Sequence, residues 1–169
     1  QKWRELKSGL WINKYGDIAF KTQAMTGLEY EPAIVDVFIS NFGFNESPPL
    51  KTFIDTLTFT QLGYTFFKDK NHIYHYYAMS DGGSFNIYEE ADLTTFKVIG
   101  GCYARDKNHI YHERSGIIEG ADYKTFKTKE SIKGCFAKDK FGYFAWGDRI
   151  KKEDMNDEYV QKAIKELNR

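Results

Sequence analysis

The segment FFKDKNHIYH at residues 66–75 is nearly repeated as YARDKNHIYH at residues 103–112. A third copy, FAKDKFGYFA, occupies residues 136–145, and a degenerate copy, WINKYGDIAF, occupies residues 11–20. Each copy places a short polar segment between two apolar and aromatic runs, which is the pattern of a β-hairpin. One such unit cannot bury its apolar face alone, so the sequence predicts a repeat protein whose neighbouring copies pack together.

The polar segment of each copy predicts the geometry of its turn. Its first residue, Asp69 in the first full copy, can accept bonds from nearby backbone amides in an Asx turn. Its fourth residue is expected to be the left-handed residue of a type I turn with a bulge. Gly16 and Gly142 take this conformation easily, and we expect His72 and His109 to take it in the other copies, because histidine is enriched there.

The strand that follows each turn should alternate its side chains between two faces. In the first full copy, Tyr74 and Tyr76 then share one face, opposite His75 and Tyr77. One apolar position recurs in every copy and is expected to face the core. It is occupied by Ile18, Tyr74, Tyr111 and Phe144.

A second motif alternates with the first along the chain. It reads ADLTTF at residues 91–96 and ADYKTF at residues 121–126, and KTF at residues 51–53 resembles an earlier copy. The pattern predicts a helical turn that is capped by an aspartate and followed by a phenylalanine in the core. The expected caps are Asp92 and Asp122, and the expected core residues are Phe96 and Phe126.

Outside the repeats, residues 32–39 are apolar and β-branched and predict a strand, whereas the polar residues 2–8 are expected to be frayed. Residues 156–168 predict an amphipathic helix that is capped by Asn156. Its apolar stripe should cover the open end of the last repeat. This stripe consists of Val160, Ala163, Ile164 and Leu167.

The predicted fold class is therefore mainly β. Repeated β-hairpin units with capped helical turns should form a continuous or stacked sheet, followed by the C-terminal amphipathic helix. We expect a single domain over residues 1–169. It should hold a degenerate repeat at about 9–53, repeats at about 54–96, 97–126 and 127–155, and the helix at 156–168.

Composition excludes several classes of protein. The chain of 169 residues carries 24 Lys plus Arg and 24 Asp plus Glu, and a net charge of zero argues against a nucleic-acid partner. Its 14 Phe, 12 Tyr and 3 Trp argue against disorder. No apolar run approaches the roughly 18 residues of a membrane helix, so we predict no membrane-spanning segment.

The repeats at Asp69 and Asp106, together with GADYKTF at residues 120–126, resemble the bacterial DKNYY repeat family. The resemblance implies a bacterial source and a small β-rich protein, of the kind found in the cell envelope or beside toxin genes as immunity proteins. It supplies no shared catalytic activity that could be carried over to this chain. The location that it favours is the periplasm or cell envelope rather than the cytoplasm, although the sequence leaves the compartment unknown.

The polar residues of the repeats do not assemble into a catalytic or metal-binding pattern. Asp69, Asp106 and Asp139 occupy equivalent turns on separate units, whereas glycosidase carboxylates must lie within about 10 Å of each other. Residues three apart on a strand point to opposite faces, so one metal ion cannot easily collect both histidines of a segment. These histidines are His72, His75, His109 and His112. We predict no catalytic residue, no metal and no cofactor.

The two cysteines, Cys102 and Cys135, occupy equivalent positions in consecutive repeats. Neither has a local motif that would activate a nucleophile, and small buried apolar residues are the favoured interpretation. A disulfide stays open as an alternative. It requires repeats that stack in register at about 4.8 Å, because equivalent strands two apart in one sheet lie about 9.5 Å apart.

Several aromatic residues exceed what a core of this size needs. On an exposed sheet face they would form a recognition surface, whereas the alternative is that they cover the core beneath lysine stems. The predicted binding surface is Tyr76, Tyr77, Tyr88, Tyr143 and Trp146.

These observations favour a non-enzymatic protein-recognition module, most concretely an immunity-like protein that neutralises a secreted bacterial toxin as its protein partner. The alternative is a cell-envelope protein that binds a glycan or small ligand through an aromatic sheet face. An enzyme that uses His75, His112 or a cysteine is the third and least supported hypothesis.

Overall fold

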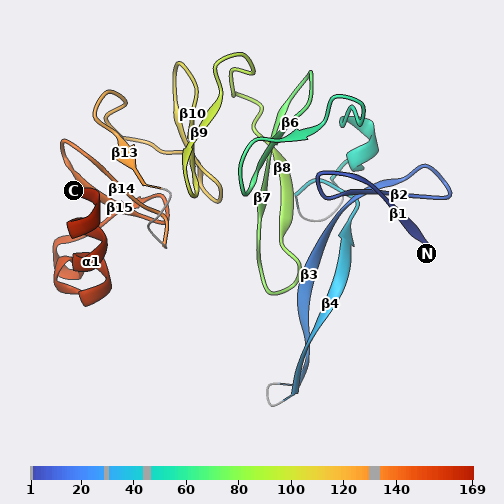
Figure 1. Ribbon diagram of the computed structural model, residues 1–169, viewed down its shortest axis with the longest axis horizontal. Helices are drawn as coiled ribbons and strands as arrows, with labels where there is room; N and C mark the ends of the chain where they lie inside the picture. The colour runs from blue at the N-terminus through green and yellow to red at the C-terminus, as the bar shows by residue number, and fades with distance from the viewer. Residues whose placement is uncertain (1, 29–30, 44–46, 130–133) are drawn as a thin grey trace. The chain divides into compact units, whose positions relative to one another are not determined.

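The computed structural model describes residues 2–28, 31–43, 47–129 and 134–169, and in these the protein is mainly β, as predicted (Figure 1). The chain forms two compact units, residues 1–90 and 91–169. Each unit is described by itself. The described strands form four separate four-stranded antiparallel sheets rather than one continuous sheet.

The first unit contains two of these sheets. The polar segment that was expected to be frayed is strand β1, whose partner is β2, and the strand predicted over residues 32–39 is β4. A short 3-10 helix, η1 (Leu50–Thr52), lies between the sheets in the sequence. The strands are β1 (Trp3–Lys7), β2 (Leu10–Asn13), β3 (Ile18–Leu28) and β4 (Glu31–Ile39), then β5 (Thr60–Gln61), β6 (Phe66–Lys68), β7 (Ile73–Tyr77) and β8 (Ser84–Ile87).

The second unit contains the other two sheets and ends in helices. In each sheet the strands follow one another in chain order, so each is an up-and-down meander centred on one predicted hairpin. The strands are β9 (Lys97–Gly100), β10 (Tyr103–Arg105), β11 (Ile110–His112) and β12 (Gly116–Ile117), then β13 (Lys127–Thr128), β14 (Phe136–Asp139), β15 (Gly142–Ala145) and β16 (Asp148–Arg149). The helices are η2 (Lys152–Asn156) and α1 (Glu158–Leu167).

The recurring apolar position faces the core in every copy, as predicted. Tyr74 joins Phe20, Phe67 and Phe85 in the core of the first unit, where the centroid of the Phe85 ring lies 4.8–5.8 Å from those of the other three. In the second unit, the ring of Phe126 packs tilted against that of Phe144 in the core, with 5.4 Å between the centroids. The aromatic excess of the sequence therefore lies largely inside the two units. Ile18, Tyr74, Tyr111 and Phe144 are all buried.

The Asx turns are confirmed, but the prediction that His72 and His109 have a left-handed backbone conformation is wrong. Gly16 and Gly142 have φ angles of 78° and 145°, whereas the φ angles of His72 and His109 are not positive. The reason is that Asp69 N–H donates to the carbonyl of His72, and Asp106 N–H does the same to His109. Each histidine is thus already paired at the start of a strand and keeps an ordinary backbone conformation.

Helix α1 begins one residue later than predicted. Its N-cap is Asp157, whose carboxylate accepts the backbone N–H groups of Tyr159 and Val160, whereas Asn156 ends the 3-10 helix η2. Aspartate satisfies the free amides at a helix start and also suits the positive end of the helix dipole. Ala163 and Leu167 are buried against Phe136, so the stripe covers the last sheet as expected.

Candidate functional site

The aspartate of each Asp-Lys turn is the centre of a polar cluster. In the copy at Asp106, Oδ1 accepts the backbone N–H groups of Asn108 and His109, each at 2.7 Å. Oδ2 accepts the N–H of Asp92 and the hydroxyl of Tyr111, each at 2.8 Å. The carboxylate is buried, so these four donors replace the water that it has lost. The first half of the cluster joins the turn to a residue fourteen positions earlier.

The lysine that follows the aspartate makes the second half of this cluster. The Lys107 backbone N–H donates to Thr95 Oγ1 at 3.0 Å, and its Nζ lies 2.6 Å from the carboxylate of Asp92. Asp92 in turn accepts the Thr95 N–H and so closes its own helical turn. The two sequence motifs are therefore the two halves of one structure. We call it the aspartate clamp, formed in this copy by Asp92, Thr95, Asp106 and Lys107.

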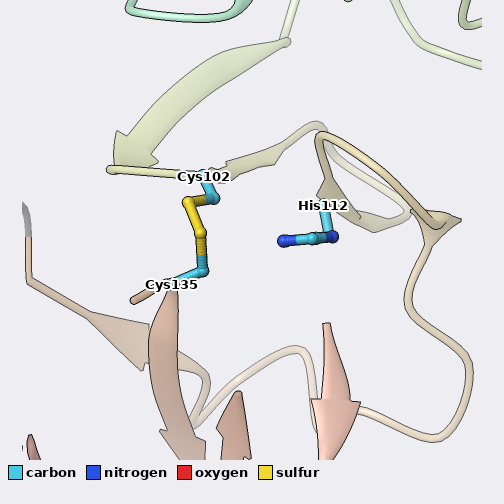
Figure 2. Close-up of side chains that lie close together, drawn as sticks. All are labelled: Cys102, His112 and Cys135. Carbon is cyan, nitrogen blue, oxygen red and sulfur yellow. A yellow bond between two sulfur atoms is a disulfide. The ribbon is translucent and has the colours of Figure 1, made fainter. Parts of the chain in front are cut away.

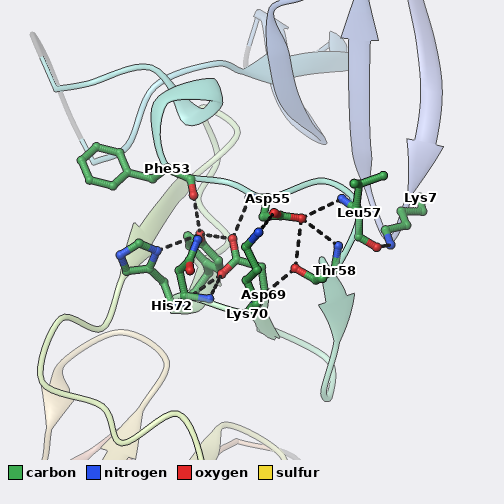
Figure 3. Close-up of polar contacts among 10 residues, drawn as sticks. Lys7, Phe53, Asp55, Leu57, Thr58, Asp69, Lys70 and His72 are labelled. Atoms are coloured by element: carbon green, nitrogen blue, oxygen red, sulfur yellow. Dashed lines mark hydrogen bonds and ion pairs between the residues drawn. The ribbon is translucent and has the colours of Figure 1, made fainter.

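Figure 3 shows the same clamp in the first unit, where Asp55 and Thr58 meet Asp69 and Lys70. The earlier copy of the second motif is therefore DTLTF at residues 55–59, and its assignment to KTF at residues 51–53 is wrong. The match was missed because the alanine before the aspartate is replaced by isoleucine. Each capped turn is bonded to the hairpin that follows it, whereas the expected boundaries at 96 and 126 divide the two.

The last clamp, between Asp122 and Asp139, lacks the tyrosine hydroxyl because Phe144 occupies that position. Arg149 takes its place. Its guanidinium donates to both carboxylate oxygens of Asp139 at 3.0 and 2.9 Å, and its centre lies 4.3 Å above the ring of Phe144. Burial opposes ionisation, but the bonds from Arg149 and from the Asp122 N–H lower the pKa of Asp139 to about 2.

These contacts give the recurring aspartates a structural role instead of a catalytic one. Burial opposes ionisation of Asp106, and the bonds from three backbone amides and Tyr111 nevertheless hold its pKa below the ordinary value. A general base needs a free oxygen beside a substrate and a pKa nearer to neutral. The clamp carboxylates are used to join two turns, which supports the structural interpretation of the motif.

The two cysteines form a disulfide whose Cα atoms are 5.4 Å apart, which corrects the favoured interpretation of two buried thiols (Figure 2). Figure 2 also shows the imidazole of His112 extending from β11 toward this disulfide. The sulfur atoms and one ring nitrogen all lie within 4.8 Å of one another. Burial lowers the pKa of His112 to about 4, so the imidazole is neutral at pH 7. The sequence argument missed this group because it tested histidines only in pairs within one segment.

The aromatic residues predicted as a binding surface occupy different environments. In the first unit, Tyr88 is 8% exposed and stacks on His75, and Tyr76 packs against the core with its hydroxyl bonded to Gly82 O and Thr22 Oγ1. Tyr77 is half-buried at the end of β7.

In the second unit, Tyr143 packs beside helix α1, and Trp146 is 50% exposed. The five residues thus belong to two units, and Trp146 offers the most surface. Whether any of them binds a partner stays a prediction.

A more exposed apolar surface lies on the long hairpin of the first unit. Strand β2 pairs with β3 only as far as Phe20, so residues 21–28 and 31–38 continue as a two-stranded ribbon, which we call the β3–β4 arm (Figure 1). Met25 and Ile34 are directly opposite each other on one face and are 61% and 67% exposed. Among the described residues, β4 pairs with β3 on one side and with no strand on the other, which leaves an open edge.

The base of this arm is held by the β7–β8 loop. The Met25 N–H donates to Ser80 O at 2.7 Å, and the hydroxyls of Tyr76 and Thr22 are hydrogen-bonded to each other. Gly82 has a φ of 112°, and an added Cβ there would lie 2.6 Å from a methyl group of Val37. The loop therefore holds the backbone of the arm as far as Met25, whereas the side chains of Met25 and Ile34 stay exposed.

The second unit carries a shallow groove of about 650 Å³. Phe141 and Tyr143 contribute aromatic surface to it, and Lys124 and Lys127 contribute positive charge. Lys138 also lines the groove and bonds through Nζ to Asn168. Such a lining suits an anionic or sugar ligand better than an apolar one.

No helix among the described residues has the length and apolarity to cross a membrane. No curated protein and no solved structure matches the chain. The model of the DKNYY family matches residues 76–148, which contain the clamps of Asp106 and Asp139. The match supports the resemblance to the DKNYY family that the repeated motifs carry over this segment.

Proposed function

We propose that the protein is a non-enzymatic protein-recognition module and that the β3–β4 arm is its recognition element. The observation that carries this proposal is the exposed pair of Met25 and Ile34 beside the open edge of β4. An extended segment of a protein partner would pair with this edge through its backbone and cover the two side chains. Exposed apolar surface on an edge strand otherwise favours aggregation, so its presence supports a binding role.

The arm suits recognition because its base is already ordered. Bonds from Met25 N–H and Tyr76 hold it, so little conformational entropy is lost when a partner docks. Burying two side chains such as Met25 and Ile34 contributes about 1.5–3 kcal/mol each. The ion pair between Lys21 and Asp36 on the same ribbon would help to fix the register of the partner strand.

The most concrete form of this proposal is an immunity-like protein whose partner is a secreted bacterial toxin. Its support is twofold: the clamps account for the polar residues of the repeats, and the family resemblance suggests the role. A rigid, disulfide-linked repeat scaffold suits an inhibitor that must act without rearrangement. A periplasmic or envelope location and a bacterial source belong to this proposal.

Affinity capture from the organism that encodes the chain tests the proposal. Tagged wild-type protein is compared with the variant Met25→Ser/Ile34→Ser, and captured proteins are quantified by mass spectrometry. The matched control is Leu57→Ser, which changes a still more exposed apolar residue of the same unit outside the arm. We expect one protein to be enriched by the wild type and by the control and to be lost from the arm variant.

The captured protein is then purified and titrated by calorimetry, where the arm variant should bind at least tenfold more weakly. The immunity role requires in addition that the captured protein is toxic when expressed alone and harmless when co-expressed with this chain. Equal binding by the arm variant and the wild type would overturn the assignment of the arm. Enrichment of no protein would overturn the function itself.

The groove of the second unit favours a second candidate, the binding of a glycan or small ligand in the cell envelope. Phe141 is exposed at this groove and could stack on a sugar ring, beside the hydroxyl of Tyr143. Titration with envelope glycans should then quench tyrosine fluorescence, and Phe141→Ser should abolish the effect. An unchanged signal in the wild type would remove this candidate.

A further inference from the structure

The group of Cys102, His112 and Cys135 in the second unit has no part in the proposed recognition. Its sulfur atoms and imidazole converge from three different segments, within 4.8 Å of one another (Figure 2). His112 is fully buried and Cys135 nearly so. Two thiolates and one neutral imidazole form a ligand set that Zn²⁺ prefers, and three protein ligands leave its fourth position open.

We propose that reduction of the Cys102–Cys135 disulfide converts this group into a zinc site with Cys102, Cys135 and His112 as ligands. A tetrahedral zinc ion separates such ligand atoms by about 3.5–3.8 Å. In the oxidised protein the two sulfur atoms are bonded and so lie closer than this, and the imidazole nitrogen lies within 4.8 Å of both. After the bond is broken, rotation of the two cysteine side chains is sufficient to bring their sulfur atoms to the metal.

The backbone holds both cysteines in place independently of the disulfide. The carbonyl of Cys135 accepts the hydroxyl of Tyr103 at 2.6 Å and the N–H of Trp146 at 3.1 Å. The carbonyl of Cys102 accepts the N–H of Glu113 at 3.0 Å. Reduction therefore leaves the two thiols facing each other in a prepared site rather than on free loops.

The surroundings of His112 suit a metal-binding histidine. Ser115 Oγ and the backbone N–H of Arg114 each lie 3.3 Å from Nδ1. When the other ring nitrogen binds a metal, Nδ1 carries the proton and donates it to Ser115 Oγ, and the bond from Arg114 is lost. Such an outer hydrogen bond orients the imidazole of most metal-binding histidines. Tyr103 packs against the ring at a centroid distance of 5.2 Å and limits its rotation.

The other repeats provide an internal comparison. His75 occupies the position of His112 one repeat earlier, opposite Phe66, but Thr65 stands where the second unit has Cys102. In the last repeat, Ala145 replaces the histidine. Thiols and histidine thus come together only at the junction of the two repeats in the second unit, among the residues that the structure describes.

The chemistry balances with a dithiol as the reductant. Thiol–disulfide exchange transfers two electrons and two protons, so that the dithiol becomes a disulfide and Cys102 and Cys135 become thiols. Binding of Zn²⁺ then releases the two thiol protons to solvent as both sulfur atoms coordinate the metal. Exchange with a disulfide as the oxidant forms the Cys102–Cys135 bond again, converts that disulfide to a dithiol with two protons from solvent, and expels the ion.

The test compares oxidised and reduced full-length protein, titrated anaerobically with Co²⁺ and then with Zn²⁺. We expect reduced protein to bind one ion per chain, with a thiolate-to-cobalt absorption band that Zn²⁺ abolishes. The oxidised protein should bind none. His112→Gln should weaken the affinity at least tenfold, whereas the matched variant His75→Gln should leave it unchanged.

X-ray absorption of the zinc-loaded wild type gives a second measurement that does not depend on the folding of a variant. Two sulfur neighbours and at least one nitrogen neighbour from imidazole are expected. Failure of the reduced protein to bind a stoichiometric ion would overturn the proposal, and so would a zinc ion without an imidazole neighbour. Neither result bears on partner capture by the arm.

Discussion

The carboxylate of Asp106 accepts a hydrogen bond from the backbone N–H of Asp92, fourteen residues earlier in the chain, at 2.8 Å. Equivalent bonds of 2.7 and 2.8 Å join Asp69 to Asp55 and Asp139 to Asp122. This one contact connects the two motifs that recur along the chain. It makes each capped turn part of the hairpin that follows it.

The first prediction concerns the stability of this clamp. Asp106→Ala leaves two turn amides, the Asp92 amide and the Tyr111 hydroxyl without their acceptor, and should lower the free energy of unfolding by about 3–5 kcal/mol. Lys107→Ala removes only a solvent-screened ion pair and should have a much smaller effect. Urea unfolding of the two variants measures the difference, and equal effects would contradict the assigned roles.

The second prediction concerns acid stability. The pKa of Asp106 is lowered in the folded protein and that of Asp139 falls to about 2, whereas an unfolded aspartate titrates near about 3.9. Their contribution is therefore complete above about pH 4 and is lost as the pH falls toward about 2. Unfolding measured from pH 7 to pH 2 should show this loss. Asp106→Asn should be less stable at neutral pH and should depend less on pH; an unchanged slope would count against the mechanism.

The third prediction tests the replacement of a tyrosine hydroxyl by Arg149. Arg149→Met should destabilise the protein by about 2–3 kcal/mol, because the buried carboxylate of Asp139 loses two charged donors. In that background, Phe144→Tyr should recover about 1 kcal/mol, because a hydroxyl there can reach Asp139 as Tyr111 reaches Asp106.

A double-mutant cycle of Arg149 and Phe144 measures this coupling by urea unfolding. Phe144→Tyr alone should be close to neutral, because Arg149 already satisfies the carboxylate. If the substitution were equally stabilising in both backgrounds, the proposed compensation would be incorrect.

The fourth prediction concerns the disulfide. It closes a loop with a sequence separation of 33 residues, so Cys102→Ser/Cys135→Ser should lower the free energy of unfolding by about 3–4 kcal/mol. Alkylation under denaturing conditions followed by mass measurement should label no cysteine before reduction and two after it. Labelling of both cysteines in unreduced protein, purified under oxidising conditions, would exclude the bond.

The fifth prediction tests where the C-terminal helix begins. Asp157→Ala removes the acceptor of the Tyr159 and Val160 amides and should cost about 1 kcal/mol. Asn156→Ala lies before the cap and should have little effect. Thermal unfolding followed by circular dichroism compares the two, and a larger effect at Asn156 would restore the boundary predicted from the sequence.

Much of the fold could be predicted because its signals are local and repeated. The position of Tyr74 and Tyr111 in the core follows from strand alternation, and the Asx turns follow from aspartate chemistry. The conformation of His72 could not be predicted in the same way. It depends on which carbonyl oxygen accepts the Asp69 N–H, and the residues of the turn are compatible with more than one acceptor.

The long-range contacts were less accessible to sequence reasoning. Nothing local shows that Asp106 bonds Asp92, that Arg149 replaces a hydroxyl, or that His112 points at a disulfide between two repeats. Each of these contacts forms only when separate parts of the chain pack against one another. The exposure of the β3–β4 arm was missed for a related reason, since residues 32–39 have the same apolar composition as a buried strand.

The central claim is that the repeated motif builds the scaffold, whereas recognition belongs to the arm. The most direct measurement is quantitative capture of the partner by three forms side by side: wild type, Met25→Ser/Ile34→Ser and Lys107→Ala. Equal thermal unfolding of the wild type and the arm variant is the control for folding.

We expect Lys107→Ala to retain the partner at the wild-type level and the arm variant to lose it. Retention of the partner by a folded arm variant, together with its loss from Lys107→Ala, would contradict the claim and return recognition to the repeated motif.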